Sequence, residues 1–146
     1  MPFQKDEDRE TSLKTFVVLS KTYKKLMDRA VKDMKQYDLS PSEFMILDLL
    51  YAKGKYPLQQ IGGKILVTSG SITYNIDKLE KKGLLKRVNC EDDRRVTYAE
   101  ITTAGQELFE HIFPSHAELI HSLVDVLPMD EKKEIIRLLK KLGKGV

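Results

Sequence analysis

Apolar residues recur every three or four positions along most of the chain, a spacing typical of amphipathic helices. The first periodic stretch covers residues 11–37, and its apolar positions are Leu13, Phe16, Val17, Tyr23, Leu26, Met27, Ala30, Val31, Met34 and Tyr37. A second helix is predicted to begin at Ser40, because Pro41 suits a first helical turn and Glu43 completes a capping box. We expect this helix to end at Gly54.

Two shorter helices are predicted next. Pro57 opens the first of them, and its apolar positions are Leu58, Ile61 and Ile65. Thr68 or Ser69 caps the second, and Gly83 ends it. Its inward face carries Ile72, Ile76 and Leu79. The glycine pair 62–63 falls within the short helix that Pro57 opens, where each glycine lowers helix stability by about 1 kcal/mol relative to alanine. We expect the pair to permit close approach of the next helix; the alternative is local weakness of a short helix.

A hairpin and a long helix follow. Residues 84–88 and 96–101 predict two β-strands joined by a charged turn. Thr102 or Thr103 then caps a helix in which Pro114 should produce a kink or an interruption.

The order of elements indicates the fold. A last helix covers about residues 129–142, with apolar positions Ile135, Ile136, Leu138, Leu139 and Leu142. Two helices, a short helix, a capped helix, a hairpin and two further helices make up the chain, and the middle of this series is a winged helix-turn-helix. We therefore predict a single domain of 146 residues that is mainly α, with a small β-hairpin wing and long terminal helices.

Basic side chains are concentrated in the predicted winged region. Residues 53–95 hold ten Lys and Arg against five Asp and Glu, a net charge of +5. Residues 1–52 are neutral overall, and residues 96–146 carry a net charge of −2. The positive charge by itself would fit a solvated surface equally well. The coincidence of this charge with the winged region favours double-stranded DNA as the partner.

Composition excludes several other classes of protein. Hydrophobic residues make up 41% of the chain, enough for a buried core. The single cysteine, Cys90, excludes an intrachain disulfide framework and a multi-cysteine zinc site. The polar N-terminal segment predicts no signal peptide, and no run of about 20 apolar residues predicts a membrane span. A cytoplasmic protein with no membrane partner is therefore expected.

The capped fourth helix is the element expected to enter the major groove. Its expected DNA-binding residues are Ser69, Gly70, Ser71, Thr73, Tyr74, Asn75, Lys78 and Lys81. The first three lie at the helix N-terminus, where free N–H groups hold a phosphate. Thr73 suits contact with a base, whereas Asn75 points partly inward. The alternative for Tyr74 is an ordinary surface tyrosine.

The hairpin supplies a second set of DNA-binding residues. Arg94 and Arg95 lie at its tip beside Asp93, and an arginine on a thin hairpin fits the negative potential of the minor groove. Lys86 and Arg87 on the first strand are candidates for phosphate contacts. The alternative is a solvated turn with a cluster of charges.

These residues resemble the MarR family of bacterial winged helix-turn-helix transcriptional regulators. The matching segments are Leu39–Pro41, Ser69–Thr73, Leu79–Leu85, Asp93–Arg95 and Ile101–Gly105. They span Leu39 to Leu108, about half of the chain, and the order of elements matches nearly all of it.

The resemblance implies a homodimer in which the first, fifth and sixth helices of two chains interleave. Residues 8–37 and 103–146 would form the helical dimerisation region, and residues 40–102 the DNA-binding region. Arg95 matches the arginine that enters the minor groove, and Asp93 matches the aspartate that orients it. The family mostly represses nearby genes from pseudo-palindromic operators, and many members release DNA when a small aromatic or phenolic compound binds or a cysteine is oxidised.

The sequence also departs from parts of the family. No cysteine lies near the start of the first helix, where peroxide-sensing members carry one, and Cys90 is interpreted as an ordinary surface cysteine. The histidines His111, His116 and His121 are spaced by five residues, so each step turns about 140° around a helix and they share no face. We therefore predict no metal site, and no cofactor is indicated.

A ligand pocket would lie between the first, second and fifth helices. Its candidate lining residues are Tyr23, Met27, Phe44, Leu47, Phe113 and His116. Most of them would equally be ordinary core residues.

Three functions remain to be compared. A ligand-responsive, sequence-specific repressor is favoured because Thr73 and Tyr74 accompany small polar groups on the recognition face. A nucleoid protein that binds DNA without specificity would show a face of only Lys and Arg. An enzyme is disfavoured, because no nucleophile lies beside a base and no catalytic residue is indicated.

Overall fold

The structure is a computed structural model that describes residues 6–65 and 69–146, with only the backbone described for residues 69–71. Its elements are α1 (Glu7–Lys35), α2 (Pro41–Lys53), β1 (Lys55–Pro57), α3 (Leu58–Ile61), α4 (Ser69–Lys81), β2 (Leu85–Asn89), β3 (Thr97–Ile101), α5 (Thr103–Val124) and α6 (Met129–Lys144). The fold is mainly α with one small antiparallel sheet, so the predicted winged helix-turn-helix architecture is confirmed.

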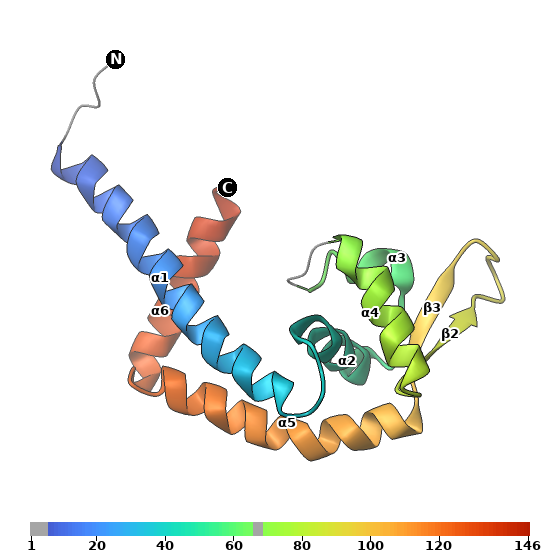
Figure 1. The fold of residues 1–146 in the computed structure, drawn as a ribbon. Helices are drawn as coiled ribbons and strands as arrows, with labels where there is room; N and C mark the ends of the chain where they lie inside the picture. Colours follow the sequence, from blue (N-terminus) through green and yellow to red (C-terminus); the bar gives the residue numbers. More distant parts are fainter. Residues whose placement is uncertain (1–5, 66–68) are drawn as a thin grey trace.

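The molecule divides into a winged lobe and a pair of terminal helices. Helices α2, α3 and α4 and the sheet form the lobe, while α1 and α6 extend away from it (Figure 1). Helix α5 runs from the base of the wing to the terminal helices, and it packs on both α1 and α2. The winged lobe and the terminal helices are therefore joined along α5.

Helix ends follow the capping signals of the sequence. The Ser40 hydroxyl accepts a hydrogen bond from the Glu43 N–H, and the Glu43 side chain accepts one from the Ser40 N–H, which confirms the capping box. Thr102, the first of the two candidate threonines, caps α5 by accepting from the Gly105 N–H. Of the two candidate caps for α4, Thr68 lies outside the described residues, as does the side chain of Ser69.

The first helix begins earlier than its apolar pattern indicates. Asp6 caps it by accepting the N–H of Arg9 at 2.7 Å, so the helix gains a polar turn ahead of the predicted start. In helix α5, the first of the two outcomes predicted for Pro114 is the one observed. Pro114 lies inside an unbroken helix, and Figure 1 shows a change of direction near the middle of α5, so a kink forms rather than an interruption.

The segment between α2 and α4 differs most from its prediction. Helix α3 ends at Ile61, so the glycine pair 62–63 follows the helix instead of lying within it. A Cβ added at Gly62 would lie 2.9 Å from the Ile72 Cδ1 atom, which confirms close approach of α4 at this position. Gly63 shows only ordinary contact distances, so the same explanation is wrong there.

The sheet contains a strand that the sequence pattern does not predict. Strand β1 pairs with β3 on the side opposite β2, which gives the order β1-β3-β2. Three residues that include Pro57 are too few for an alternating pattern, and proline is tolerated in a strand only at an edge, where β1 lies. Strand β1 thereby connects the wing to the end of α2.

The hydrophobic core lies between the helices of the winged lobe and α5. Ile46, Leu47 and Leu50 of α2 are fully buried, and they form one cluster with Ile76 and Leu79 of α4. Phe109 of α5 closes this cluster from the other side, with its ring 5.6 Å from that of Phe44 between centroids.

Helix α6 and the part of α1 before residue 27 leave their apolar residues uncovered in a single chain. Phe16 of α1 is 70% exposed, and none of the residues of α6 is buried. Uncovered apolar positions include Leu13, Val17, Val18, Tyr23, Ile135, Ile136, Leu139 and Leu142. None of the helices within the described residues combines the length and apolar character needed to span a membrane.

Candidate DNA-binding surface

Helix α4 is held on α2 by its apolar face. Ile72, Ile76 and Leu79 are all buried, as the helical spacing predicts. Burial of aliphatic side chains of this size contributes about 1.5–3 kcal/mol each, so α4 is fixed mainly by hydrophobic packing. The opposite face of the helix is thereby directed outward.

A buried glutamate adds polar contacts between α2 and α4. Glu43 accepts a hydrogen bond from the Lys82 Nζ atom at 2.8 Å, and the Lys78 Nζ atom lies 3.4 Å from its other oxygen. Burial opposes ionisation of Glu43, but the hydrogen bonds from Lys82 and the Ser40 N–H, together with both lysine charges, hold its pKa below the usual value. Lys82 also donates to the Asp38 carbonyl at 2.7 Å. The sequence marks Glu43 only as a capping residue, and gives no signal for these lysine contacts.

The outer face of α4 carries part of the predicted set. Tyr74 is 62% exposed, and Thr73 and Lys81 are exposed beside it. Lys78 is half-buried, and its Nζ atom lies 5.4 Å from the centre of the Tyr74 ring. The predicted side-chain contacts of Ser69, Gly70 and Ser71 lie outside the part of the chain whose side chains the structure describes, although all three belong to the first turn of α4.

Asn75 lies inside the lobe. It is 5% exposed, and its Oδ1 atom accepts a hydrogen bond of 3.1 Å from the Ser40 hydroxyl. The predicted inward tilt is therefore confirmed and is larger than expected. This position ties α4 to the start of α2 and does not present Asn75 on the outer face.

The wing holds Arg95 in a defined geometry. The Arg95 side chain is 90% exposed, yet its Nε donates to the Asp93 Oδ1 at 3.1 Å and its Nη2 contacts the Asp93 Oδ2 at 3.4 Å. The Arg95 backbone N–H also donates to Asp93, and the two kinds of hydrogen bond hold the Asp93 pKa below its usual value. Arg94 is exposed on the same turn. The wing thus presents a guanidinium whose orientation is set by a neighbouring carboxylate.

Arg87 does not lie as a free phosphate contact. Its Nη1 is 2.5 Å from the Glu80 Oε1 and its Nη2 is 2.5 Å from the Asp77 Oδ1, so both ends of the guanidinium are paired with α4. Lys86, its neighbour on β2, is exposed. Lys86 and Arg87 are both predicted to contact phosphates, but in the structure Arg87 is paired with α4 and Lys86 is exposed.

Comparison with known proteins identifies the family of this chain. The MarR family model matches residues 39–97. The HTH-type transcriptional regulator MhqR of Bacillus subtilis (strain 168) is 49% identical over 134 residues, which cover 92% of this chain and 92% of that protein. The chain belongs to the MarR family. It is a DNA-binding transcriptional regulator, as the winged helix-turn-helix indicates.

Solved structures of other proteins share the fold. A mutant MarR from Escherichia coli complexed with operator DNA has a TM-score of 0.79 at 21% identity, and covers 94% of this chain and 99% of its own. NadR in complex with 4-hydroxyphenylacetate has a TM-score of 0.75 at 24% identity, and covers 99% of both chains. At these identities the likeness establishes the architecture alone.

This MarR-family chain also contains a pocket between α1, α2 and α5. Its volume is about 340 Å³, and its lining residues are Met34, Phe44, Met45, Asp48, Phe113, His116, Ala117 and Ile120. Phe44, Phe113 and His116 confirm half of the predicted lining, whereas Tyr23, Met27 and Leu47 do not line it. Leu47 is instead a fully buried core residue.

The polar side chains that line this pocket are Asp48 and His116, and the buried Asp33 pairs with His116 behind the lining. The His116 Nδ1 atom lies 2.7 Å from the buried Asp33 Oδ2, and the His116 ring packs on Phe44 with 4.5 Å between centroids. Partial burial raises the pKa of Asp48, and the nearby His116 charge opposes that rise. Asp33 and Asp48 are not predicted as pocket residues, because an aspartate on a helix is expected to face solvent.

The single cysteine and the histidines do not form a metal-binding group among the described residues. Cys90 is half-buried in the wing loop. His121 lies near Asp125, with 3.7 Å between Nε2 and Oδ2, whereas His116 pairs with Asp33. Among the described residues, no three His, Cys, Asp or Glu side chains are grouped to hold a metal ion.

Proposed function

We propose that this regulator is a homodimeric, cytoplasmic repressor that binds a pseudo-palindromic operator with α4 in the major groove and the wing in the minor groove. The observation that carries the proposal is the exposed Arg95 already held by Asp93. An arginine ordered before binding loses less side-chain entropy when it enters a groove. Tyr74, Thr73 and Lys81 form the second contact surface, and Figure 1 shows the wing tip and the N-terminal end of α4 on the same side of the lobe.

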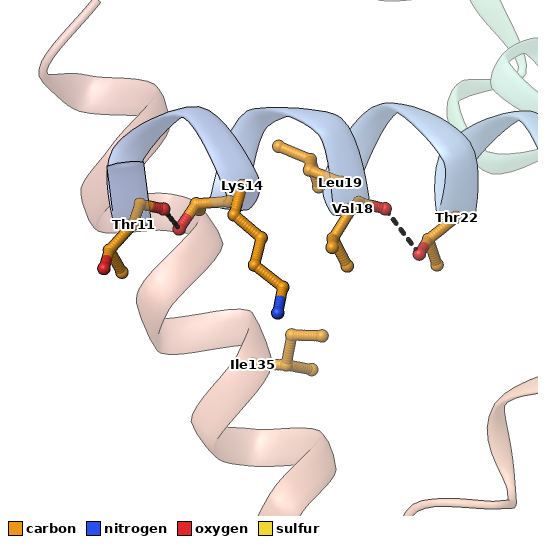
Figure 2. Close-up of a pocket in the computed structure, with 7 residues that line it drawn as sticks. Thr11, Lys14, Val18, Leu19, Thr22 and Ile135 are labelled. Atoms are coloured by element: carbon orange, nitrogen blue, oxygen red, sulfur yellow. Dashed lines mark hydrogen bonds between the residues drawn. The ribbon is translucent and has the colours of Figure 1, made fainter. Parts of the chain in front are cut away.

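The uncovered terminal helices support the homodimer. A groove of about 370 Å³ lies between α1 and α6, and its lining residues are Thr11, Lys14, Thr15, Val18, Leu19, Thr22 and Ile135 (Figure 2). Figure 2 shows Val18 and Leu19 along one helix and Ile135 on the other. A continuous apolar surface of this kind on two long helices is typical of a protein–protein interface. A second copy of the same chain brings an identical surface, as a two-fold interface requires.

Selection of bound sequences from a random DNA pool tests this function. We expect an inverted repeat whose half-site centres lie about one helical turn, or roughly 34–36 Å, apart. Binding should weaken steeply with salt, with a log–log slope on the order of −5 or steeper, because each protomer neutralises several phosphates. Recovery of unrelated sequences at equal affinity would instead support the alternative, a nucleoid-type protein without specificity.

We also propose that a small aromatic, phenolic compound releases the operator by binding the pocket between α1, α2 and α5. Aromatic rings of Phe44 and Phe113 suit a flat ligand, and Asp48 and His116 supply hydrogen-bond partners for a hydroxyl group. None of the lining residues is Lys or Arg, which favours a neutral phenol or hydroquinone over a carboxylate.

Titration of the operator complex with matched compounds tests this ligand class. Phenol and hydroquinone should release DNA at lower concentration than benzoate. Asp48→Asn should reduce this difference in potency between the two phenols and benzoate. Equal potency of the phenols and benzoate would contradict the proposed chemistry. If Cys90→Ser abolished release by hydroquinone but not by phenol, the result would point to addition of the Cys90 thiolate to benzoquinone, which dissolved oxygen forms from hydroquinone, instead of pocket binding.

A further inference from the structure

Arg87 connects the wing to the recognition helix. It lies on β2, opposite the buried Ala99 of β3, so its backbone is fixed in the sheet. Its guanidinium reaches back to two carboxylates of α4, with 2.5 Å between Nη2 and the Asp77 Oδ1 and 2.5 Å between Nη1 and the Glu80 Oε1. The Arg87 backbone N–H also lies 3.3 Å from the Glu80 Oε2. One residue therefore makes three polar contacts across the junction between α4 and β2.

The positions of the two carboxylates bear on DNA binding. Asp77 lies one helical turn after Tyr74 and Thr73, on the face that is directed outward. Unpaired carboxylates at this place would repel the phosphate backbone. Arg87 offsets part of this charge, and if it turned away to bind a phosphate it would leave both carboxylates facing the DNA.

We propose that Arg87 is a positioning residue that fixes the angle between the wing and the recognition helix, and that Asp77 and Glu80 are its anchors. Arg95 enters a minor groove and Tyr74 a major groove only if the two elements are held at a set separation. A planar guanidinium with paired carboxylates sets such a separation better than a single contact does. This inference rests on the proposed DNA-binding function and adds to it a role for residues that do not touch DNA.

Conservative substitution separates positioning from phosphate binding. Arg87→Lys keeps the positive charge but cannot bridge both carboxylates, so operator affinity should fall about 5–30-fold, corresponding to ~1–2 kcal/mol. Affinity for unrelated DNA and the salt slope should stay close to wild type. Lys81→Gln is the matched control for a phosphate contact: it should weaken binding to all DNA and reduce the salt slope by about 1 for each protomer, or about 2 for the dimer.

The anchors supply a test whose sign differs between the two roles. Asp77→Asn and Glu80→Gln each remove a negative charge near DNA, so simple electrostatics predicts tighter binding to every sequence. Loss of the anchor predicts weaker operator binding instead, and Arg87→Lys combined with Asp77→Asn should cost less than the sum of the single changes. Circular dichroism and thermal unfolding of each variant should match wild type, because the two anchor side chains are about half exposed.

Failure of this inference and failure of the proposed function give different results. If Arg95→Ala weakens operator binding while Arg87→Lys, Asp77→Asn and Glu80→Gln leave it unchanged or tighter, the positioning role is wrong and the proposed function stands. If the wild-type protein selects no operator at all, the proposed function fails first. Weaker operator binding by the anchor variants, with the salt slope preserved, supports Arg87 as the positioning residue.

Discussion

Helices α4 and α6 are both amphipathic, but they differ in what covers their apolar faces. Helix α4 buries Ile72, Ile76 and Leu79 within its own chain, whereas α6 buries none of its residues. The core of the winged lobe is therefore covered within one chain, with help from α1 and α5, whereas the apolar face of α6 is not. Sequence periodicity predicts both apolar faces equally well, but only the structure shows which of them stays uncovered in a single chain.

The largest expected effect comes from removing the uncovered helix. Deletion of residues 129–146 should abolish both the dimer and specific DNA binding, because the two recognition helices would no longer be held as a pair. Sedimentation and operator binding measure the two losses. A truncated chain that still dimerises and binds the operator at wild-type affinity would show that α6 is not part of the interface.

Two phenylalanines sharpen the comparison between the regions. Phe109→Ala removes a fully buried ring beside Phe44 and should lower the free energy of unfolding by about 3–5 kcal/mol. Phe16→Ala lies on the exposed face of α1, so it should weaken dimer association and leave the winged lobe folded. Chemical unfolding at several protein concentrations separates the two results. A large loss of lobe stability in Phe16→Ala would contradict the division into two regions.

The wing should matter for DNA binding and little for stability. Arg95→Ala should weaken specific binding by roughly 1–3 kcal/mol, the range of a good base-reading contact. Its side chain is solvated, so the unfolding temperature should change little. Arg94→Ala, on the same turn, is the matched control and should weaken operator and unrelated DNA to the same smaller extent. Equal specific losses from the two variants would remove the special role of Arg95.

The smallest expected effect is a dependence of stability on pH from Glu43. The Glu43 pKa lies below 4.5 in the folded state, so ionised Glu43 stabilises the lobe above that pH and the stabilisation is lost as the pH falls through the folded value. Glu43→Gln should therefore be less stable than wild type at pH 7, with the difference shrinking below pH 4.5. Urea unfolding across this range measures it. A difference that grows on acidification would contradict the pairing with Lys82.

Local signals predicted the elements that position the site. The capping box at Ser40, the glycine that ends α4 and the spacing of Ile72, Ile76 and Leu79 each depend on residues close in sequence, and each is confirmed. Strand β1 was missed because its pairing with β3 is a contact between segments far apart in the chain. The predicted end of helix α3 is too late, because the apolar spacing continues to Ile65 beyond the glycine pair that follows the helix.

Polar side chains were harder to place than elements. Arg87 and Arg95 are equivalent in a list of basic residues, but one pairs with α4 and the other is held outward by Asp93. That difference depends on the angle at which β2 leaves α4, which no residue spacing reports. The pairing of Asp93 with Arg95, which the family resemblance implies, is present in the structure and joins residues only two positions apart.

The most direct test of the central claim is the effect of Asp93→Ala on operator affinity. If Asp93 orients Arg95 for the minor groove, affinity for the operator should fall although a negative charge near DNA is removed. Asp92→Ala, on the same exposed turn, is the matched control for the loss of charge alone. Weaker operator binding by Asp93→Ala, with no such loss in Asp92→Ala, is the predicted result. Tighter binding to all DNA sequences by both variants would contradict it, and would show that the wing tip acts only through its charge.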